Sequence, residues 1–373
     1  MNKIEQGLVP ATPMMNPFQV NEISEQEARS IFQQMAMYQV PGVGLAVIDD
    51  FKIDLVKSYG VREAGTEKFV DDKTLFQGAS TSKLVVAAVV LHLVDKGVFD
   101  LNEDVNSYLV SWKIPENEFT RDQKVTLELL LTHQAGFPET NFPYDEDKGP
   151  PTLVQVLDGE SPAENKPARV EYVPGTEWTY SNIGYVVIQQ ILEDTLGKPL
   201  PQIIQEIVFE PLGMKSSTYI YPLKEDWAKN EAMPHDSQGM ACEPAMLPTA
   251  LAQGGLMTTP QDLAILMIEF MKSYHGQSAN LLSKQMVHRM LVPLRDIVLS
   301  GVPCKQGLGV FLFGEGPDLM FFHPGQAYPG STSWPYAFPQ RGMGAVVMTN
   351  GNNGFPLTLE IIAAITNAYA PGR

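Results

Sequence analysis

The strongest chemical signal in the chain is the run Ser80-Thr81-Ser82-Lys83. A serine and a lysine three residues apart lie about one helical turn from each other, so their side chains can face the same way. The apolar run 84–88 predicts a buried helix, and burial favours the neutral amine that can act as a base. Backbone N–H groups at the start of this helix could hold an oxyanion. The pattern therefore predicts a nucleophilic serine beside its base. A helix-capping serine with a snorkelling lysine is the alternative interpretation.

Tyr180 and Asn182 form a second pattern, a Tyr-x-Asn that precedes a predicted helix over 182–196. A phenol has an ordinary pKa of about 10. A neighbouring ammonium would stabilise the phenolate, and Tyr180 could then accept a proton. Asn182 offers both a donor and an acceptor to an amide or ester group. The alternative interpretation is a core tyrosine followed by an asparagine that caps the helix, which would give the same sequence.

The third pattern, His323-Pro324-Gly325, ends a predicted strand over 319–322. A glycine at that point lets a substrate approach the strand backbone closely. The next residue, Gln326, has a backbone N–H that could act with that of Ser80 as an oxyanion donor. The alternative is a strand-ending histidine before an ordinary Pro-Gly turn.

The elements that must position these residues come in a simple order. Two strands form a hairpin near the start, a long middle region is mainly helical, and several strands and a final helix follow. We expect an α/β plus all-α fold, with an antiparallel sheet built from both chain ends, flanked by helices, and an inserted helical lobe. The α/β lobe takes residues 1–79 and 296–373, the helical lobe 80–295, and the active site lies in the cleft between them. The predicted elements are strands 44–48, 53–59, 308–313, 319–322, 331–338 and 345–348, and helices 80–94, 182–196, 260–274 and one from 356.

Composition excludes several classes of partner. The formal charge of −17 opposes a phosphate backbone, so we expect no nucleic acid partner. Two cysteines, Cys242 and Cys304, cannot build a disulfide framework, and their pairing is open. No run is long enough for a transmembrane span, and 1–20 lacks the apolar core of a secretory signal, so we expect a cytoplasmic protein. The oligomeric state is not set by the sequence.

Two other hydrolase classes fit poorly. A metallohydrolase needs ligand spacing such as His-Glu-x-x-His, which the histidines do not offer. An α/β-hydrolase needs Gly-x-Ser-x-Gly after a strand, and residues 78–82 lack the final glycine.

Together and in this order, the three patterns resemble the active-site elements of penicillin-recognising serine enzymes. This is the serine β-lactamase and penicillin-binding-protein superfamily, with a class C β-lactamase-type fold. The resemblance runs from about Pro41 to Asn350 and implies the two-lobe fold described above. Further stretches that look like the family are 130–136, Pro174-Gly175, 211–214, 254–259 and 346–350.

The resemblance also implies roles for the site residues. Ser80 would attack a carbonyl carbon while Lys83 and Tyr180 relay its proton to the leaving group. The backbone N–H groups of Ser80 and Gln326 would form the oxyanion hole, and Asn182 would hold the acyl side chain. Water would then release the acyl-enzyme, with Tyr180 as base. No metal or organic cofactor is needed.

One departure from the family bears on the substrate. β-Lactamases of this group usually carry Lys-Thr-Gly in the third element, and here His323 and Pro324 replace the lysine and threonine that grip a carboxylate. A histidine is only partly charged at neutral pH, and proline offers neither a hydroxyl nor an N–H. His-x-Gly resembles carboxylesterases, D-stereospecific aminopeptidases and some DD-peptidases of this fold.

We therefore expect a serine hydrolase that acts on small esters or amides, a carboxylesterase first of all, with His323 and Gly325 in substrate binding. The alternatives are a D-stereospecific peptidase or amidase, a weak β-lactamase, an acyltransferase, and a slowly deacylating penicillin-binding sensor.

Overall fold

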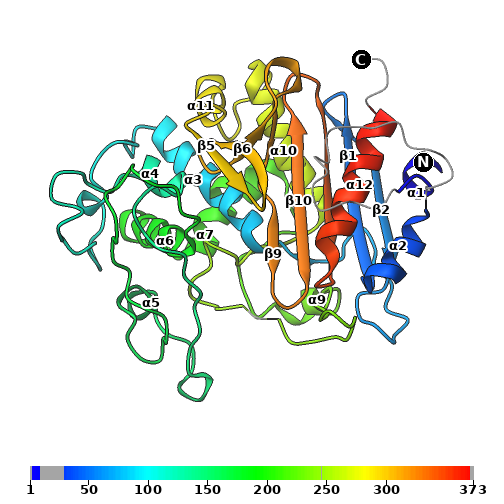
Figure 1. Ribbon diagram of the computed structural model, residues 1–373, viewed down its shortest axis with the longest axis horizontal. Helices are drawn as coiled ribbons and strands as arrows, with labels where there is room; N and C mark the ends of the chain where they lie inside the picture. Colours follow the sequence, from blue (N-terminus) through cyan, green and yellow to red (C-terminus); the bar gives the residue numbers. More distant parts are fainter. Residues whose placement is uncertain (1, 9–28, 245, 370–373) are drawn as a thin grey trace.

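The computed structural model describes residues 2–8, 29–244 and 246–369 (Figure 1). One antiparallel sheet lies at the centre, in the order β2-β1-β11-β10-β8-β7-β6-β5, and β9 pairs with β10. A second, small sheet joins β3 to β4. The strands are β1 Gly42–Asp49, β2 Lys52–Gly60, β3 Phe76–Gln77, β4 Met257–Thr258, β5 Arg295–Leu299, β6 Val302–Gln306, β7 Phe311–Phe313, β8 Met320–Phe322, β9 Gly325–Ala327, β10 Ser331–Phe338 and β11 Met343–Thr349.

The middle of the sheet joins the two ends of the chain, as the sequence predicts. β1 pairs with β11, Val43 lying opposite Thr349. The hairpin of β1 and β2 turns through Asp50 and Phe51, whose φ values of 49° and 58° suit a tight two-residue turn. The antiparallel sheet flanked by helices confirms the predicted fold class.

Helices cover both faces of the sheet, and the alternation of side chains along β1 shows how (Figure 1). Val43, Leu45 and Val47 join the hydrophobic cluster that contains α2 and α12. Ala46 and Ile48 point the other way, into the larger cluster with α3, α6 and α10. The helices are α1 Asn2–Glu5, α2 Ile31–Tyr38, α3 Ser82–Asp95, α4 Leu127–Leu131, α5 Leu153–Asp158, α6 Asn182–Leu196, α7 Leu200–Ile204, α8 Glu210–Leu212, α9 Glu225–Ala228, α10 Pro260–His275, α11 Lys284–Met290 and α12 Gly354–Tyr369.

The structure also contains short helical turns. They are the 3-10 turns η1 Ala79–Thr81, η2 Val105–Ser107, η3 Glu146–Lys148 and η5 Gly316–Asp318, and the π-helical turn η4 Gln205–Phe209. α10 belongs to the segment assigned to the helical lobe, yet it packs on β1, β10 and β11. The division into lobes at 79/80 and 295/296 therefore stays a prediction.

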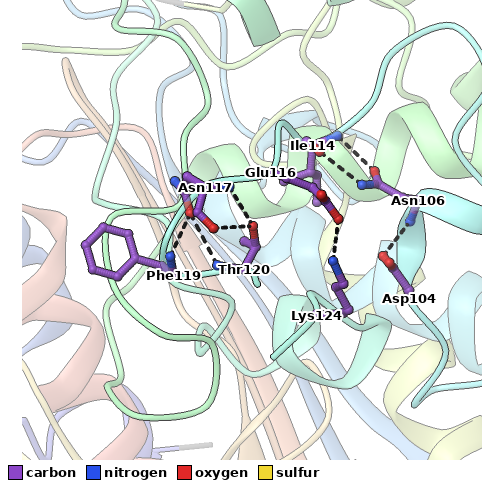
Figure 2. Close-up of polar contacts among 8 residues, drawn as sticks. All are labelled: Asp104, Asn106, Ile114, Glu116, Asn117, Phe119, Thr120 and Lys124. Atoms are coloured by element: carbon purple, nitrogen blue, oxygen red, sulfur yellow. Dashed lines mark hydrogen bonds and ion pairs between the residues drawn. The ribbon is translucent and has the colours of Figure 1, made fainter. Parts of the chain in front are cut away.

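An irregular segment between α3 and α4 is held by side chains that bond the backbone (Figure 2). The side chain of Asn106 makes two hydrogen bonds to the backbone of Ile114. Its Oδ1 accepts from the N–H at 2.9 Å, and its Nδ2 donates to the carbonyl at 3.0 Å. Lys124 pairs with Glu116 across the same loop. The two bonds of Asn106 replace backbone pairing that a helix or strand would supply.

The sheet differs from the sequence prediction in several places, and β9 was not among the predicted strands. The hairpin of β5 and β6 was not expected, because its strands bury few apolar side chains, Ile297 and Cys304 among them. The strand predicted from residue 308 begins at Phe311.

The described residues bear on two points raised by the composition, the open pairing of the cysteines and the expected lack of a membrane span. Cys242 and Cys304 are both free thiols, so they do not pair. None of the helices described is long and apolar enough to cross a membrane.

Candidate active site

Ser80 lies in η1, between β3 and α3. The preceding residue, Ala79, has a φ of 46°, a left-handed conformation that costs energy for a residue with a side chain. Ala79 and Thr81 are buried, whereas Ser80 stays half-buried. Thr81 donates to the carbonyl of His323 at 3.1 Å. This bond ties the turn that carries Ser80 to the third sequence pattern.

Lys83 is completely buried, so it does not snorkel. Its Nζ lies 3.1 Å from Oγ of Ser80, 2.8 Å from Oδ1 of Asn182 and 2.7 Å from the carbonyl of Gln253. Burial lowers the pKa of Lys83 well below its ordinary value, which favours the neutral amine. A neutral amine has two hydrogens and one lone pair. The two carbonyl-type oxygens can only accept, so in the neutral amine they would take the two hydrogens and the lone pair would face the hydroxyl of Ser80.

Tyr180 is half-buried beside this pair, with its ring centroid 5.0 Å from Nζ of Lys83. Burial raises the pKa of Tyr180 above its ordinary value, and a hydrogen bond with Ser80 offsets part of that rise. The expected phenolate is therefore not the resting form. Burial disfavours both charged forms, so it favours a neutral amine on Lys83 and a protonated phenol on Tyr180.

His133 is hydrogen-bonded to the residues that precede and follow Tyr180 in the sequence. Its carbonyl accepts from the N–H of Thr179 at 3.0 Å, and its Nδ1 accepts from the N–H of Ser181 at 3.1 Å. The imidazole ring lies 4.4 Å from the Tyr180 ring, centroid to centroid. Burial lowers the pKa of His133 well below its ordinary value, which keeps Nδ1 free to accept.

Asn182 begins α6, and Ser181 rather than Asn182 caps that helix, accepting from the N–H of Gly184 at 3.1 Å. While Oδ1 of Asn182 binds Lys83, its Nδ2 donates to the carbonyl of Thr140 at 3.2 Å. Asn182 thus fixes the position of the Lys83 amine. Its amide nitrogen has a second hydrogen, and the predicted contact with the acyl side chain stays a prediction.

His323 is 1% exposed, with its ring centroid 5.0 Å from that of Phe311. Its Nδ1 lies 3.1 Å from the carbonyl of Pro324, and its Nε2 has no hydrogen-bond partner among the described residues. Burial, with a smaller contribution from Lys83, lowers the pKa of His323 to about 3. The imidazole is therefore neutral at pH 7, not partly charged as the sequence alone suggests.

Gly325 brings β9 against the turn of the nucleophile. A Cβ at this position would lie 2.1 Å from the carbonyl of Gly78 and 3.0 Å from the backbone nitrogen of Ser80. The glycine is required by this packing of backbone on backbone, in addition to any approach of a substrate. Gln326 follows in β9, opposite Thr332 of β10, and its role as an oxyanion donor with Ser80 stays a prediction.

Two contributors to the site have no side-chain signature in the sequence. The carbonyls of Gln253 and Thr140 hold Lys83 and Asn182 through backbone atoms. The pairing of β3 with β4, Gln77 lying opposite Met257, brings the Gln253 loop to the turn that carries Ser80. The stretch 254–259, which looks like the family, was the sequence feature closest to Gln253.

Ser80 and the buried Lys83 are in contact between a helical region and an antiparallel sheet, as the resemblance to penicillin-recognising serine enzymes leads one to expect. The sequence matches the family described as Beta-lactamase over residues 28–369. The chain belongs to this family.

The relatives agree with that assignment. The chain is 25% identical over 354 residues to the D-alanyl-D-alanine-carboxypeptidase/endopeptidase AmpH of Escherichia coli K12, covering 94% of this chain and 83% of AmpH. It is 29% identical over 231 residues to an unguisins hydrolase of Aspergillus violaceofuscus, covering 56% of this chain and 38% of that protein.

Solved structures show the same fold. An octameric penicillin-binding protein homologue from Pyrococcus abyssi superposes with a TM-score of 0.74 at 23% identity, covering 91% of this chain and 76% of that one. The D-alanine carboxypeptidase AmpC of Burkholderia cenocepacia superposes with a TM-score of 0.70 at 20% identity, covering 91% of this chain and 96% of that one.

Proposed function

We propose that this protein is a carboxylesterase that hydrolyses small esters through an acyl-enzyme on Ser80. One observation carries the proposal: the buried amine of Lys83 lies 3.1 Å from Oγ of Ser80, with its other two contacts to oxygens that can only accept. That arrangement supports a lone pair aimed at the hydroxyl proton, which is the requirement for a general base.

Acylation then follows from the protonation states. Oγ of Ser80 attacks the carbonyl carbon as Lys83 takes its proton, and the backbone N–H groups of Ser80 and Gln326 stabilise the oxyanion. The protonated phenol of Tyr180 gives its proton to the leaving alkoxide. The products of this step are an acyl-Ser80, a free alcohol, an ammonium on Lys83 and a phenolate on Tyr180.

Deacylation reverses these roles. The new ammonium of Lys83 stabilises the phenolate of Tyr180, so the phenolate exists at the stage where a base is needed. Tyr180 takes a proton from the incoming water, which attacks the acyl carbon. Lys83 returns its proton to Oγ of Ser80 as the acid product leaves, and the resting state is restored.

The preference for esters rests on the third sequence pattern. A buried neutral His323 supplies no cation for a substrate carboxylate, which penicillins and D-alanyl-D-alanine peptides both carry. Esters that carry no carboxylate do not need this cation, so its absence does not weaken their binding. The second candidate is a D-stereospecific peptidase or amidase, because the match to AmpH spans 94% of this chain.

The test is a panel of short p-nitrophenyl esters, D-amino acid amides and a chromogenic cephalosporin, compared by kcat/KM. We expect the esters to be turned over fastest, and Ser80→Ala to abolish both turnover and labelling by a phosphonate probe. Full activity in Ser80→Ala would refute the site. A single burst without turnover would point to a slowly deacylating sensor, and new esters formed with added alcohols to an acyltransferase.

A further inference from the structure

The carbonyl of Gln253, one of the three oxygens around the Lys83 amine, belongs to a tight turn. Nζ of Lys83 lies 2.7 Å from this carbonyl. Within the turn, the carbonyl of Leu251 accepts from the N–H groups of Gly254 at 3.1 Å and Gly255 at 2.7 Å. These bonds enclose Gln253, so the direction of its carbonyl depends on where the whole turn is held.

A buried side chain of α6, that of Gln189, holds this turn. Its Oε1 accepts from the N–H groups of Leu251 at 2.9 Å and Ala252 at 3.0 Å, the two residues ahead of Gln253. Its Nε2 donates to the carbonyl of Thr249 at 2.9 Å. A single amide therefore binds three backbone groups of the segment that leads into Gln253.

Glu193, one turn further along α6, fixes which way the Gln189 amide points. Oε1 of Glu193 accepts from Nε2 of Gln189 at 3.0 Å and from the N–H of Leu200 at 3.0 Å. Because a carboxylate accepts, the amide nitrogen must face Glu193, and the amide oxygen faces the turn. Gln189 is 2% exposed, and both hydrogens and both acceptor positions of its amide are used. The amide has no hydrogen bond left for a substrate, so it acts on the site through the turn.

Gln189 lies seven residues after Asn182, two turns along the same face of α6. Asn182 accepts from the Lys83 amine directly, at 2.8 Å. We propose that Gln189 is a positioning residue for that amine: it holds the Gln253 carbonyl against Nζ, so that one helix sets the direction of both acceptors and leaves the third direction for Ser80. This inference rests on the proposed function, in which Lys83 is the base for Ser80.

The experiment compares Gln189→Met with Gln190→Met in the purified protein. Methionine has a similar size and shape but cannot make the hydrogen bonds of an amide. Gln190 is the matched control because it is 5% exposed on the same helix, and its Nε2 donates to Asp194 at 2.9 Å. Among the described residues, its side chain makes no hydrogen bond to the segment 249–252. The two variants therefore remove comparable buried bonds, and only one of them releases the turn.

Rates are counted per Ser80 that a phosphonate probe labels at completion, which removes the effect of misfolded protein. We expect Gln189→Met to lose about 10–10²-fold in kcat/KM for p-nitrophenyl acetate, because the lone pair of Lys83 is no longer directed at Ser80. The acidic limb of its pH profile should move to lower pH, since a carbonyl oxygen favours the ammonium and its loss lowers the pKa of Lys83. Gln190→Met should keep the wild-type rate and limb, even if its urea midpoint falls. Gln189→Asn, which is one methylene shorter, should lie between wild type and Gln189→Met, and it replaces Gln189→Met if that variant does not fold.

The failure of this inference differs from the failure of the proposed function. A wild-type rate per labelled site and an unmoved limb in Gln189→Met would overturn the role of Gln189 and leave the proposed function intact. A wild-type protein that turns over no ester would remove the proposed function instead. The rate of phosphonate labelling, which needs only the attack by Ser80, would then make the same comparison, and equal rates in Gln189→Met and Gln190→Met would overturn the inference.

Discussion

The side-chain nitrogen of Lys83 lies 2.8 Å from Oδ1 of Asn182, a contact between two residues 99 positions apart. Because Asn182 is itself anchored to the carbonyl of Thr140, this contact fixes the direction of the amine. In the neutral amine, one hydrogen of Lys83 points to Asn182, and the lone pair is left for Ser80.

Asn182→Asp should convert this contact into an ion pair. A carboxylate at that distance favours the ammonium and raises the pKa of Lys83, so the base is lost at neutral pH. We expect kcat/KM for p-nitrophenyl acetate to fall about 10²-fold at neutral pH, and its acidic limb to move to higher pH. Asn182→Ser, which adds no charge, should lower the rate without moving the limb. A pH profile unchanged in the aspartate variant would contradict the assignment of Lys83 as base.

Lys83→Met should make the protein slower but more stable. Between the lowered pKa of the folded state and the ordinary 10.5, the unfolded chain binds a proton that the folded protein does not. Stability is therefore lost as the pH falls below about 10.5, and methionine removes that loss. We expect a higher urea midpoint for Lys83→Met, with a gain that is larger at about pH 6 than at about pH 9, and a rate about 10²–10⁴-fold lower. A variant less stable than wild type across this range would contradict the buried neutral amine.

Tyr180→Phe should affect leaving groups unequally. An alkoxide needs the proton of the phenol, whereas p-nitrophenolate leaves without one. We expect turnover of ethyl esters to fall about 10²–10⁴-fold, and p-nitrophenyl esters to show a burst followed by slow turnover, because deacylation still lacks its base. Stopped-flow measurement of the burst checks this. Near wild-type steady-state rates on both ester types would refute the relay.

His323 should contribute to unfolding in acid. Its folded pKa of about 3 lies below the ordinary 6.5, so the unfolded state binds the extra proton and stability falls as the pH drops through that window. The loss from this group between about pH 7.5 and about pH 5 is about 2 kcal/mol. In His323→Leu, which cannot titrate, the difference in unfolding free energy between these two pH values should shrink by that amount. An unchanged difference would mean that the histidine is not buried neutral.

Gly325→Ala and Gly254→Ala form a matched pair beside the site. The first would place a Cβ 2.1 Å from the carbonyl of Gly78, whereas the second would meet nothing within 4 Å. We expect Gly325→Ala to lose about 10²-fold or more in kcat/KM, because β9 must move away from Ser80. Gly254→Ala should stay near wild type. Equal activities would show that the approach of β9 to the turn does not matter for catalysis.

The sequence was informative where chemistry depends on spacing along one element. Ser80 and Lys83 share a helical turn, and the apolar run after them predicted the burial that lowers the pKa of the amine. The helix over 182–196 and the strand over 331–338 have the bounds that the pattern gave. Capping residues and hydrophobic periodicity are local signals, so they can be recognised in one sequence.

The remaining parts of the site depend on long-range contacts. Lys83 and Asn182 bind the backbone carbonyls of Gln253 and Thr140, which every residue type has. The sequence therefore does not identify these two residues as part of the site. The neutrality of His323 comes from its burial against Phe311, twelve residues away along the chain, and the protonated state of Tyr180 from burial as well. Such environments are set by packing, which motif spacing does not report.

The pairing of β1 with β11 also governs how the protein is made. During synthesis, β1 leaves the ribosome about 300 residues before the partner that completes the centre of the sheet, the separation between Val43 and Thr349. Until then the hairpin of β1 and β2 has an unsatisfied apolar edge, which favours slow folding and association with other nascent chains. Recombinant yield should therefore depend on chaperone capacity more steeply than the finished protein's stability would suggest.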